Sequence, residues 1–240
     1  MNANDRAPRG TRLTAALGGT AFVVLQSVVH TTIAPPASSA PAASLAQYYS
    51  DRARSLATVS FVVVIAELAF IAFVIAAVRL LFKPFAGLGL AALLFGVLGA
   101  LAGSLAVIPD ATASVMVRQS GPLDPTTART LFNLHQLIGG LILLWSAVFV
   151  LLVGYQLSVS WRRWSASSVE AGTPLVPRVL LGFTVVTVMS MLLNGGARFF
   201  LSTDDHTSGI SRLHHLHDVT LAPWILITAF LLLRLRSDAA

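Results

Sequence analysis

The chain has 240 residues, of which 55% are hydrophobic and only 11% are charged. A soluble domain typically carries about 25% charged residues, so this composition excludes an ordinary water-soluble globular protein. The formal net charge of +6 comes from basic residues that stand singly or in short groups beside apolar blocks. This distribution is typical of membrane orientation signals and excludes a nucleic-acid-binding patch. The absence of cysteine excludes disulfide bonds and thiolate ligands.

Six apolar blocks, each close to the roughly 20 residues that a helix needs to cross a bilayer, follow one another along the chain. They are apolar on all sides rather than at helical or alternating period, which is typical of membrane spans. Helix is the default because a spanning segment must satisfy its own backbone. We therefore expect an all-α polytopic membrane protein, a single six-helix domain over residues 1–240, with spans at about 12–33, 57–79, 85–108, 131–157, 178–200 and 214–234.

The first block has two interpretations. Arg6, Arg9 and Arg12 precede it, and Ser38-Ser39-Ala40 resembles a cleavage site, as in a signal peptide. The block is longer than the usual apolar region of a signal peptide, and Ala40 lies well beyond its end. We favour an uncleaved first helix, with cleavage as the alternative.

Glu67 lies near the centre of the second span, among apolar residues. A carboxyl group at this depth is costly, so it usually faces the bundle and finds a partner. Its functional interpretation is a proton or cation site. Its structural interpretation is a hydrogen bond to another helix, through Gln26 or Asn194. The sequence leaves both open.

The third span is rich in glycine, and Gly99 and Gly103 form a GxxxG pair that Ala92 and Gly96 extend. Small residues let helices approach closely in lipid. We favour packing within the bundle; a homo-oligomer formed through this span is the alternative.

The outer loop after the third span is expected to hold a surface helical turn that breaks at Gly121-Pro122. Asp124, which precedes Pro125, is expected to cap the start of the fourth span.

The stretch RLHHLHDVT, residues 212–220, opens the sixth span. His214 and His217 are three residues apart, and His214 and Asp218 four, so all three share a helical face. Imidazole and carboxylate groups on one face can ligate a divalent metal. The spacing matches no specific metal motif, however, and a solvated helix start with Asp218 in its first turn is the favoured interpretation.

Haem is a second cofactor hypothesis, because axial histidines on facing helices can hold its iron. His30 and His135 lie at comparable depth on the outer side, with His214 or His217 as a further ligand. The structural alternative is that a histidine at a span end meets water. If the helices pack suitably, one outward-facing crevice would gather the polar groups Gln26, His30, His135, Gln136, Asn194, Arg198, His214, His217 and Asp218.

The orientation follows from the basic residues. With a cytoplasmic N-terminus, ten of the 16 lysines and arginines fall on the cytoplasmic side and six on the outer side. The positive-inside rule then predicts that both termini are cytoplasmic.

Several stretches resemble a class of small bacterial multi-pass membrane proteins grouped as domains of unknown function. They are LAQYYSDRARSLATVSFVVVIAELAF, LFNLHQLIGGLILLWSAVFVLLVGYQL and GTPLVPRVLLGF, and the likeness covers about residues 10–195. The chain departs from that class at Pro177-Arg178, which lacks the usual following tryptophan, and in its histidine-rich sixth span. The resemblance implies a bacterial plasma-membrane protein and transfers no site residue.

No nucleophile-base arrangement, phosphate loop or dinucleotide fingerprint is present. We therefore expect a non-enzymatic membrane protein, structural or binding a partner or small ligand, that contacts the lipid bilayer and no nucleic acid. No cofactor is the first expectation, and the protein partner is unknown. The first alternative is a haem- or metal-binding redox protein that uses the outer histidines. A weaker alternative is a proton-coupled carrier that uses Glu67.

Overall fold

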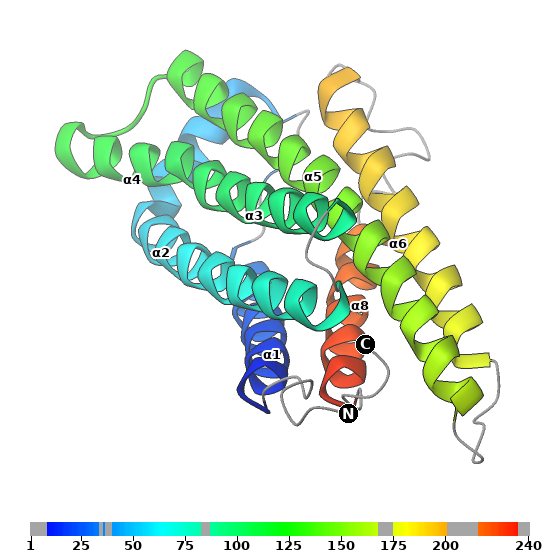
Figure 1. Ribbon diagram of the computed structural model, residues 1–240. Helices are drawn as coiled ribbons and strands as arrows, with labels where there is room; N and C mark the ends of the chain where they lie inside the picture. Colours follow the sequence, from blue (N-terminus) through cyan, green and yellow to red (C-terminus); the bar gives the residue numbers. More distant parts are fainter. Residues whose placement is uncertain are drawn as a thin grey trace.

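The computed structural model describes residues 9–33, 36, 40–82, 87–167, 175–200 and 216–234. Every regular element in these ranges is an α-helix, which confirms the all-α fold class. The helices, shown in Figure 1, are α1 (Arg9–Thr32), α2 (Ala42–Leu81), α3 (Leu88–Ala106), α4 (Ile108–Ser120), α5 (Pro125–Ser167), α6 (Leu175–Phe200) and α8 (Leu216–Arg234).

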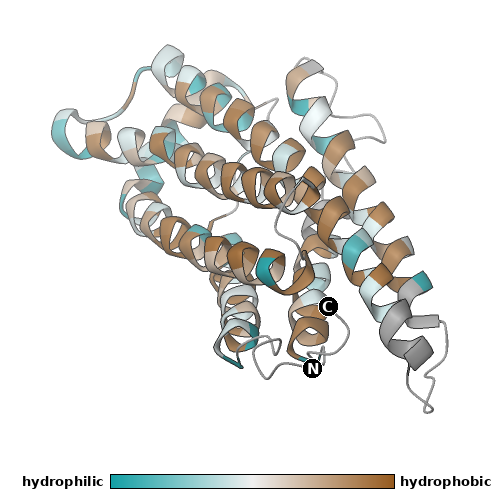
Figure 2. Ribbon diagram, in the orientation of Figure 1, coloured by the Kyte–Doolittle hydropathy of each residue, from teal (hydrophilic) through white to brown (hydrophobic). Residues whose placement is uncertain are grey.

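Among the described residues, five helices are long and apolar enough to cross a membrane: Arg9–Thr32, Ala42–Leu81, Leu88–Ser120, Pro125–Trp161 and Arg178–Phe199. The described apolar part of α8, Val219–Arg234, is shorter than these five helices. Large apolar side chains lie on the outside of the bundle, as lipid-facing residues do; Leu17 is 69% exposed and Phe61 68%. Figure 2 shows that apolar residues predominate along the long helices. These features are those of an integral membrane protein.

Two helices are much longer than the bilayer requires. At about 1.5 Å per residue, the 40 residues of α2 and the 43 of α5 reach about 60 and 64 Å, roughly twice the thickness of the hydrocarbon core. The predicted spans at 57–79 and 131–157 lie within these two helices, which extend beyond them at both ends. The helix ends carry polar and charged residues, such as Asp51 and Arg52, so they form no apolar block.

The loop expected to hold one helical turn is instead a complete helix. Pro109 has no amide hydrogen, so α3 is interrupted at Val107, and α4 then runs for 13 residues. Gly121, with φ of +87°, ends α4 in a conformation that favours glycine. The break at Gly121 is therefore where the sequence predicted it.

The main hydrophobic core lies between the spans and is built around aromatic rings. Phe149 of α5 makes edge-to-face contacts with Phe70 and Phe73 of α2 and with Trp224 of α8. Trp224, Phe73 and Phe149 are all fully buried. The rings thus join α2, α5 and α8 at the centre of the bundle.

A second, separate core lies beside α4. This core joins the start of α2, α4 and the start of α5. We call these segments the α4 lobe (residues 42–56 and 108–135; Figure 1, left). Its buried apolar side chains include Leu45, Tyr49, Leu56, Ala113, Leu123 and Phe132. The start of α2 and the start of α5 thus pack with α4 and not with the central aromatic core.

The glycines of α3 are used for packing within the chain. A methyl group on Gly99 would overlap Ser146 of α5, and one on Gly103 would overlap Glu67 of α2. Gly140 of α5 and Gly195 of α6 likewise face each other at close approach. The expected intramolecular packing is confirmed, while a homo-oligomer through the third span stays a prediction.

Candidate functional site

Glu67 is a buried carboxyl group at the contact of three helices. It lies on α2, is only 5% exposed, and its Oε1 accepts a hydrogen bond from Gln26 Nε2 of α1 at 3.3 Å. On the other side its carboxyl group packs directly against Gly103 of α3. Only glycine leaves room for the carboxyl group at that point, so this position of α3 is shaped by Glu67.

The hydrogen bond confirms one part of the structural interpretation of Glu67, which named Gln26 or Asn194 as its partner. Asn194 instead lies on α6, where its Oδ1 accepts a hydrogen bond from Arg198 Nε at 3.4 Å. A hydrogen bond to Gln26 is compatible with either role of Glu67, because a proton site in a membrane also needs a polar neighbour.

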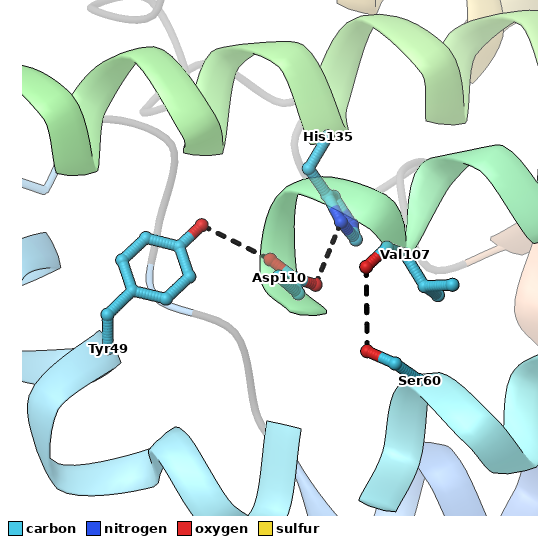
Figure 3. Close-up of polar contacts among 5 residues, drawn as sticks. All are labelled: Tyr49, Ser60, Val107, Asp110 and His135. Carbon is cyan, nitrogen blue, oxygen red and sulfur yellow. Dashed lines mark hydrogen bonds and ion pairs between the residues drawn. The ribbon is translucent and has the colours of Figure 1, made fainter. Parts of the chain in front are cut away.

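A second polar site joins the three helices of the α4 lobe (Figure 3). Tyr49 Oη of α2 donates a hydrogen bond to Asp110 Oδ1 of α4 at 3.2 Å. Asp110 Oδ2 lies 3.0 Å from His135 Nδ1 of α5. That second contact is an ion pair when the imidazole is protonated rather than an aligned hydrogen bond, because Nδ1 is buried without a hydrogen-bond partner among the described residues.

The local sequence explains how Asp110 reaches its position. It lies in the first turn of α4, directly after Pro109, where a carboxylate is favoured by the helix dipole. Its side chain is 18% exposed and that of His135 30%, so the pair is accessible from one side. Sequence reasoning noted His135 but missed Asp110 and Tyr49 as its neighbours. The aspartate after a helix-breaking proline was the available signal.

Of the other predicted cofactor and metal ligands, only His30 has a described side chain. His30 is exposed near the end of α1, and no contact joins it to His135 among the described residues. His214 lies outside the described residues, and of His217 and Asp218 only the backbone, at the start of α8, is described. Within the described ranges no three His, Cys, Asp or Glu side chains group in a way that could hold a metal ion.

The haem hypothesis for His30 and His135 and the metal hypothesis for His214, His217 and Asp218 therefore stay predictions. The visible spectrum of purified protein, oxidised and reduced, tests the first. Its metal content tests the second. Comparison of the chain with known protein families, with curated proteins and with solved structures finds no match.

Proposed function

We propose that the chain is a six-span protein of a bacterial plasma membrane, with both termini cytoplasmic, and that it is non-enzymatic and binds a partner or small ligand on the outer side through the α4 lobe. The six-span count is supported by α8, whose end lies at the same end of the bundle as the start of α1 (Figure 1). Two chain ends on the same side of a membrane require an even number of membrane crossings. The bacterial origin rests on the resemblance in sequence.

The observation that carries the binding role is the second hydrophobic core. A membrane bundle needs only about 30 Å of helix per span, yet α2 and α5 continue past it and enclose α4 around side chains of their own. A folded lobe beyond the bilayer presents a defined surface, as a simple connecting loop does not.

The charge of that surface indicates the chemistry of what it binds. Arg52, Arg54 and Arg118 are exposed on α2 and α4, and none forms an ion pair with any residue in the described ranges. The lobe therefore favours a partner or ligand that carries acidic groups, because complementary charge guides association.

The orientation is tested with single cysteines, which report cleanly because the chain has none. Arg118→Cys in α4 should react with a membrane-impermeant maleimide added to intact cells. Arg178→Cys, near the start of α6, should react only after the cells are broken. The opposite pattern would reverse the topology.

The binding role is tested by intact-mass measurement of gently purified protein. We expect a non-covalent adduct that is lost in the variant with Arg54→Glu and Arg118→Glu. A matched variant, Arg79→Glu, changes an exposed arginine at the other end of α2 and should keep the adduct. Adduct retention in the lobe variant, or its absence from the native protein, would count against this role.

A second candidate is a proton-coupled carrier, which the burial of Glu67 favours. An ionisable residue inside a span is a functional candidate by default. This role predicts that Glu67→Gln abolishes a pH-dependent flux in vesicles, while Ser158→Ala, at another buried polar position, leaves it intact. An unchanged flux in the Glu67→Gln variant would exclude the carrier.

A further inference from the structure

The contact between α2 and the α3–α4 pair follows a seven-residue repeat. Every seventh residue of α2 is buried: Ala46, Ala53, Ser60, Glu67, Val74 and Leu81. The opposing positions on α3 are small, and Gly96 and Gly103 are seven residues apart. A seven-residue repeat on both helices is typical of left-handed, side-by-side packing. We call this line of contacts the α2 seam.

The half of the seam nearer the α4 lobe carries polar contacts. Ser114 Oγ donates to the carbonyl oxygen of Ala53 at 2.5 Å, and Ser60 Oγ donates to that of Val107 at 3.5 Å. The carbonyl of Val107 lies at the break between α3 and α4, and it also accepts the Ala111 amide. The break thus places a polar group deep between the helices.

The lobe end of this line is the site around Asp110. Figure 3 shows the Ser60–Val107 contact beside the contacts of Asp110 with Tyr49 and His135. Asp110 lies three residues from Val107 in sequence, and both belong to the start of α4. Because the Asp110–His135 pair is partly exposed, the polar half of the seam opens on the surface of the lobe.

The other half of the seam, from Glu67 to the far end of α2, is lined mostly by apolar side chains, and at its far end Gln156 Nε2 of α5 donates to the carbonyl oxygen of Leu81 at 3.0 Å. A methyl group on Gly96 would meet Val74 at 2.6 Å and Phe149 at 2.9 Å. One on Gly89 would meet Phe82 at 2.8 Å. Val74 and Phe149 are fully buried, so apolar side chains fill the seam beyond Glu67, whereas the contacts of Ser60 and Ser114 lie on the lobe side of Glu67.

We infer that Glu67 is a proton-binding site that exchanges protons with the side of the membrane bearing α4, along the polar half of the α2 seam, and not with the opposite side. The inference deepens the carrier role proposed for Glu67. It adds the direction of access, which a structural role for the carboxyl group does not require.

The distance between Ser60 and Glu67 is compatible with this route. Ser60 and Glu67 are seven residues apart on one helix, which is about 10 Å at 1.5 Å per residue. Bridging water is required there, as it is at many polar contacts inside proteins. Gln26 of α1, which donates a hydrogen bond to Glu67, and Gly103 of α3, which packs against its carboxyl group, are both uncharged.

The test uses the full-length protein in lipid vesicles, with the Arg118→Cys substitution reporting which side bears α4. The pH is varied on one side of the vesicle membrane at a time. Dicyclohexylcarbodiimide, an apolar reagent that modifies protonated carboxyl groups, is then added. Mass spectrometry then measures modification at Glu67 itself. We expect modification to change severalfold with the pH on the side where the introduced thiol is labelled, and to be insensitive to pH on the other side.

Two variants sharpen this result. Ser60→Ala removes the hydroxyl between Glu67 and the lobe and should slow the response to a pH step severalfold. Ser158→Ala removes a buried hydroxyl on α5 that bonds only within its own helix, and it should not slow the response. Modification that follows the opposite side, responds equally to both sides, or fails at every pH would overturn the inference. A reversed topology is recognised separately, from the labelling of the thiol introduced in α4.

Discussion

Gly103 of α3 and Glu67 of α2 touch across the α2 seam so closely that a methyl group on the glycine would overlap the carboxyl group. Gly103→Ala should therefore push Glu67 away from Gln26 and destabilise the protein, by about 1–3 kcal/mol for an overpacked core position. Thermal unfolding in detergent measures the change.

Gly182→Ala is the matched control, because an added methyl group on this α6 glycine meets nothing within 4 Å. Its unfolding temperature should be unchanged or raised. In a Glu67→Ala background the carboxyl group is gone, so Gly103→Ala should cost much less. Equal losses with and without Glu67 would show that the carboxyl contact is not the cause.

The contact between Asp110 and His135 should hold α4 against α5. A double-mutant cycle with Asp110→Asn and His135→Gln should give a coupling energy of about 0.5–1 kcal/mol, since both groups are partly exposed. His30 and Asp51, which are both exposed and form no ion pair among the described residues, serve as the control and should show no coupling. Zero coupling for Asp110 and His135 would contradict the assigned contact.

Asp124 caps α5: its Oδ1 accepts the Thr127 amide at 2.9 Å. Hydrogen bonds from the Thr127 side chain and amide lower the pKa of Asp124 below its ordinary value of 3.8. A lowered folded-state pKa means stability that is complete above 3.8 and is lost as the pH falls below it.

Asp124→Ala should accordingly lower the unfolding temperature at neutral pH, and the difference from the native protein should shrink in strong acid. Asp51→Ala, which changes an exposed aspartate in the interior of α2, should show no such pH-dependent difference. A loss in the Asp124 variant that persists unchanged in acid would argue against the carboxylate cap.

Features set by neighbouring residues were predictable from the sequence. The Asp124 cap follows from an aspartate that precedes a proline, and the end of α4 follows from Gly121-Pro122. The Gln26–Glu67 bond was predictable for a different reason: few polar side chains lie in the spans, so a buried carboxyl group has few possible partners.

The α4 lobe and its polar site were not predicted, because they depend on how helices pack. Tyr49, Asp110 and His135 come from three helices, and no local pattern links them. The lobe ends of α2 and α5 also carry polar and charged residues, such as Asp51, Arg52 and Arg129, so a search for apolar blocks stops short of them. The seven-residue repeat of α2 was present in the sequence, but identifying its partner helix required the structure.

Trp224 and Thr184 provide a final test, in the centre of the bundle. The indole Nε1 of Trp224, on α8, donates to Thr184 Oγ1 on α6 at 3.0 Å, and both side chains are fully buried. Thr184→Val keeps the shape but removes the acceptor, which leaves the indole N–H unsatisfied in an apolar interior. The free energy of unfolding should fall by about 1–2 kcal/mol.

Thr187→Val is the matched control, one turn along α6. Thr187 is equally buried, but its hydroxyl donates only to the Phe183 carbonyl of its own helix, so its removal leaves no donor without a partner. Its unfolding temperature should fall much less. If Trp224→Phe is made first, Thr184→Val should become nearly neutral, because no indole N–H remains to be satisfied. Equal losses for the two valine variants would mean that packing, rather than this hydrogen bond, joins α6 to α8.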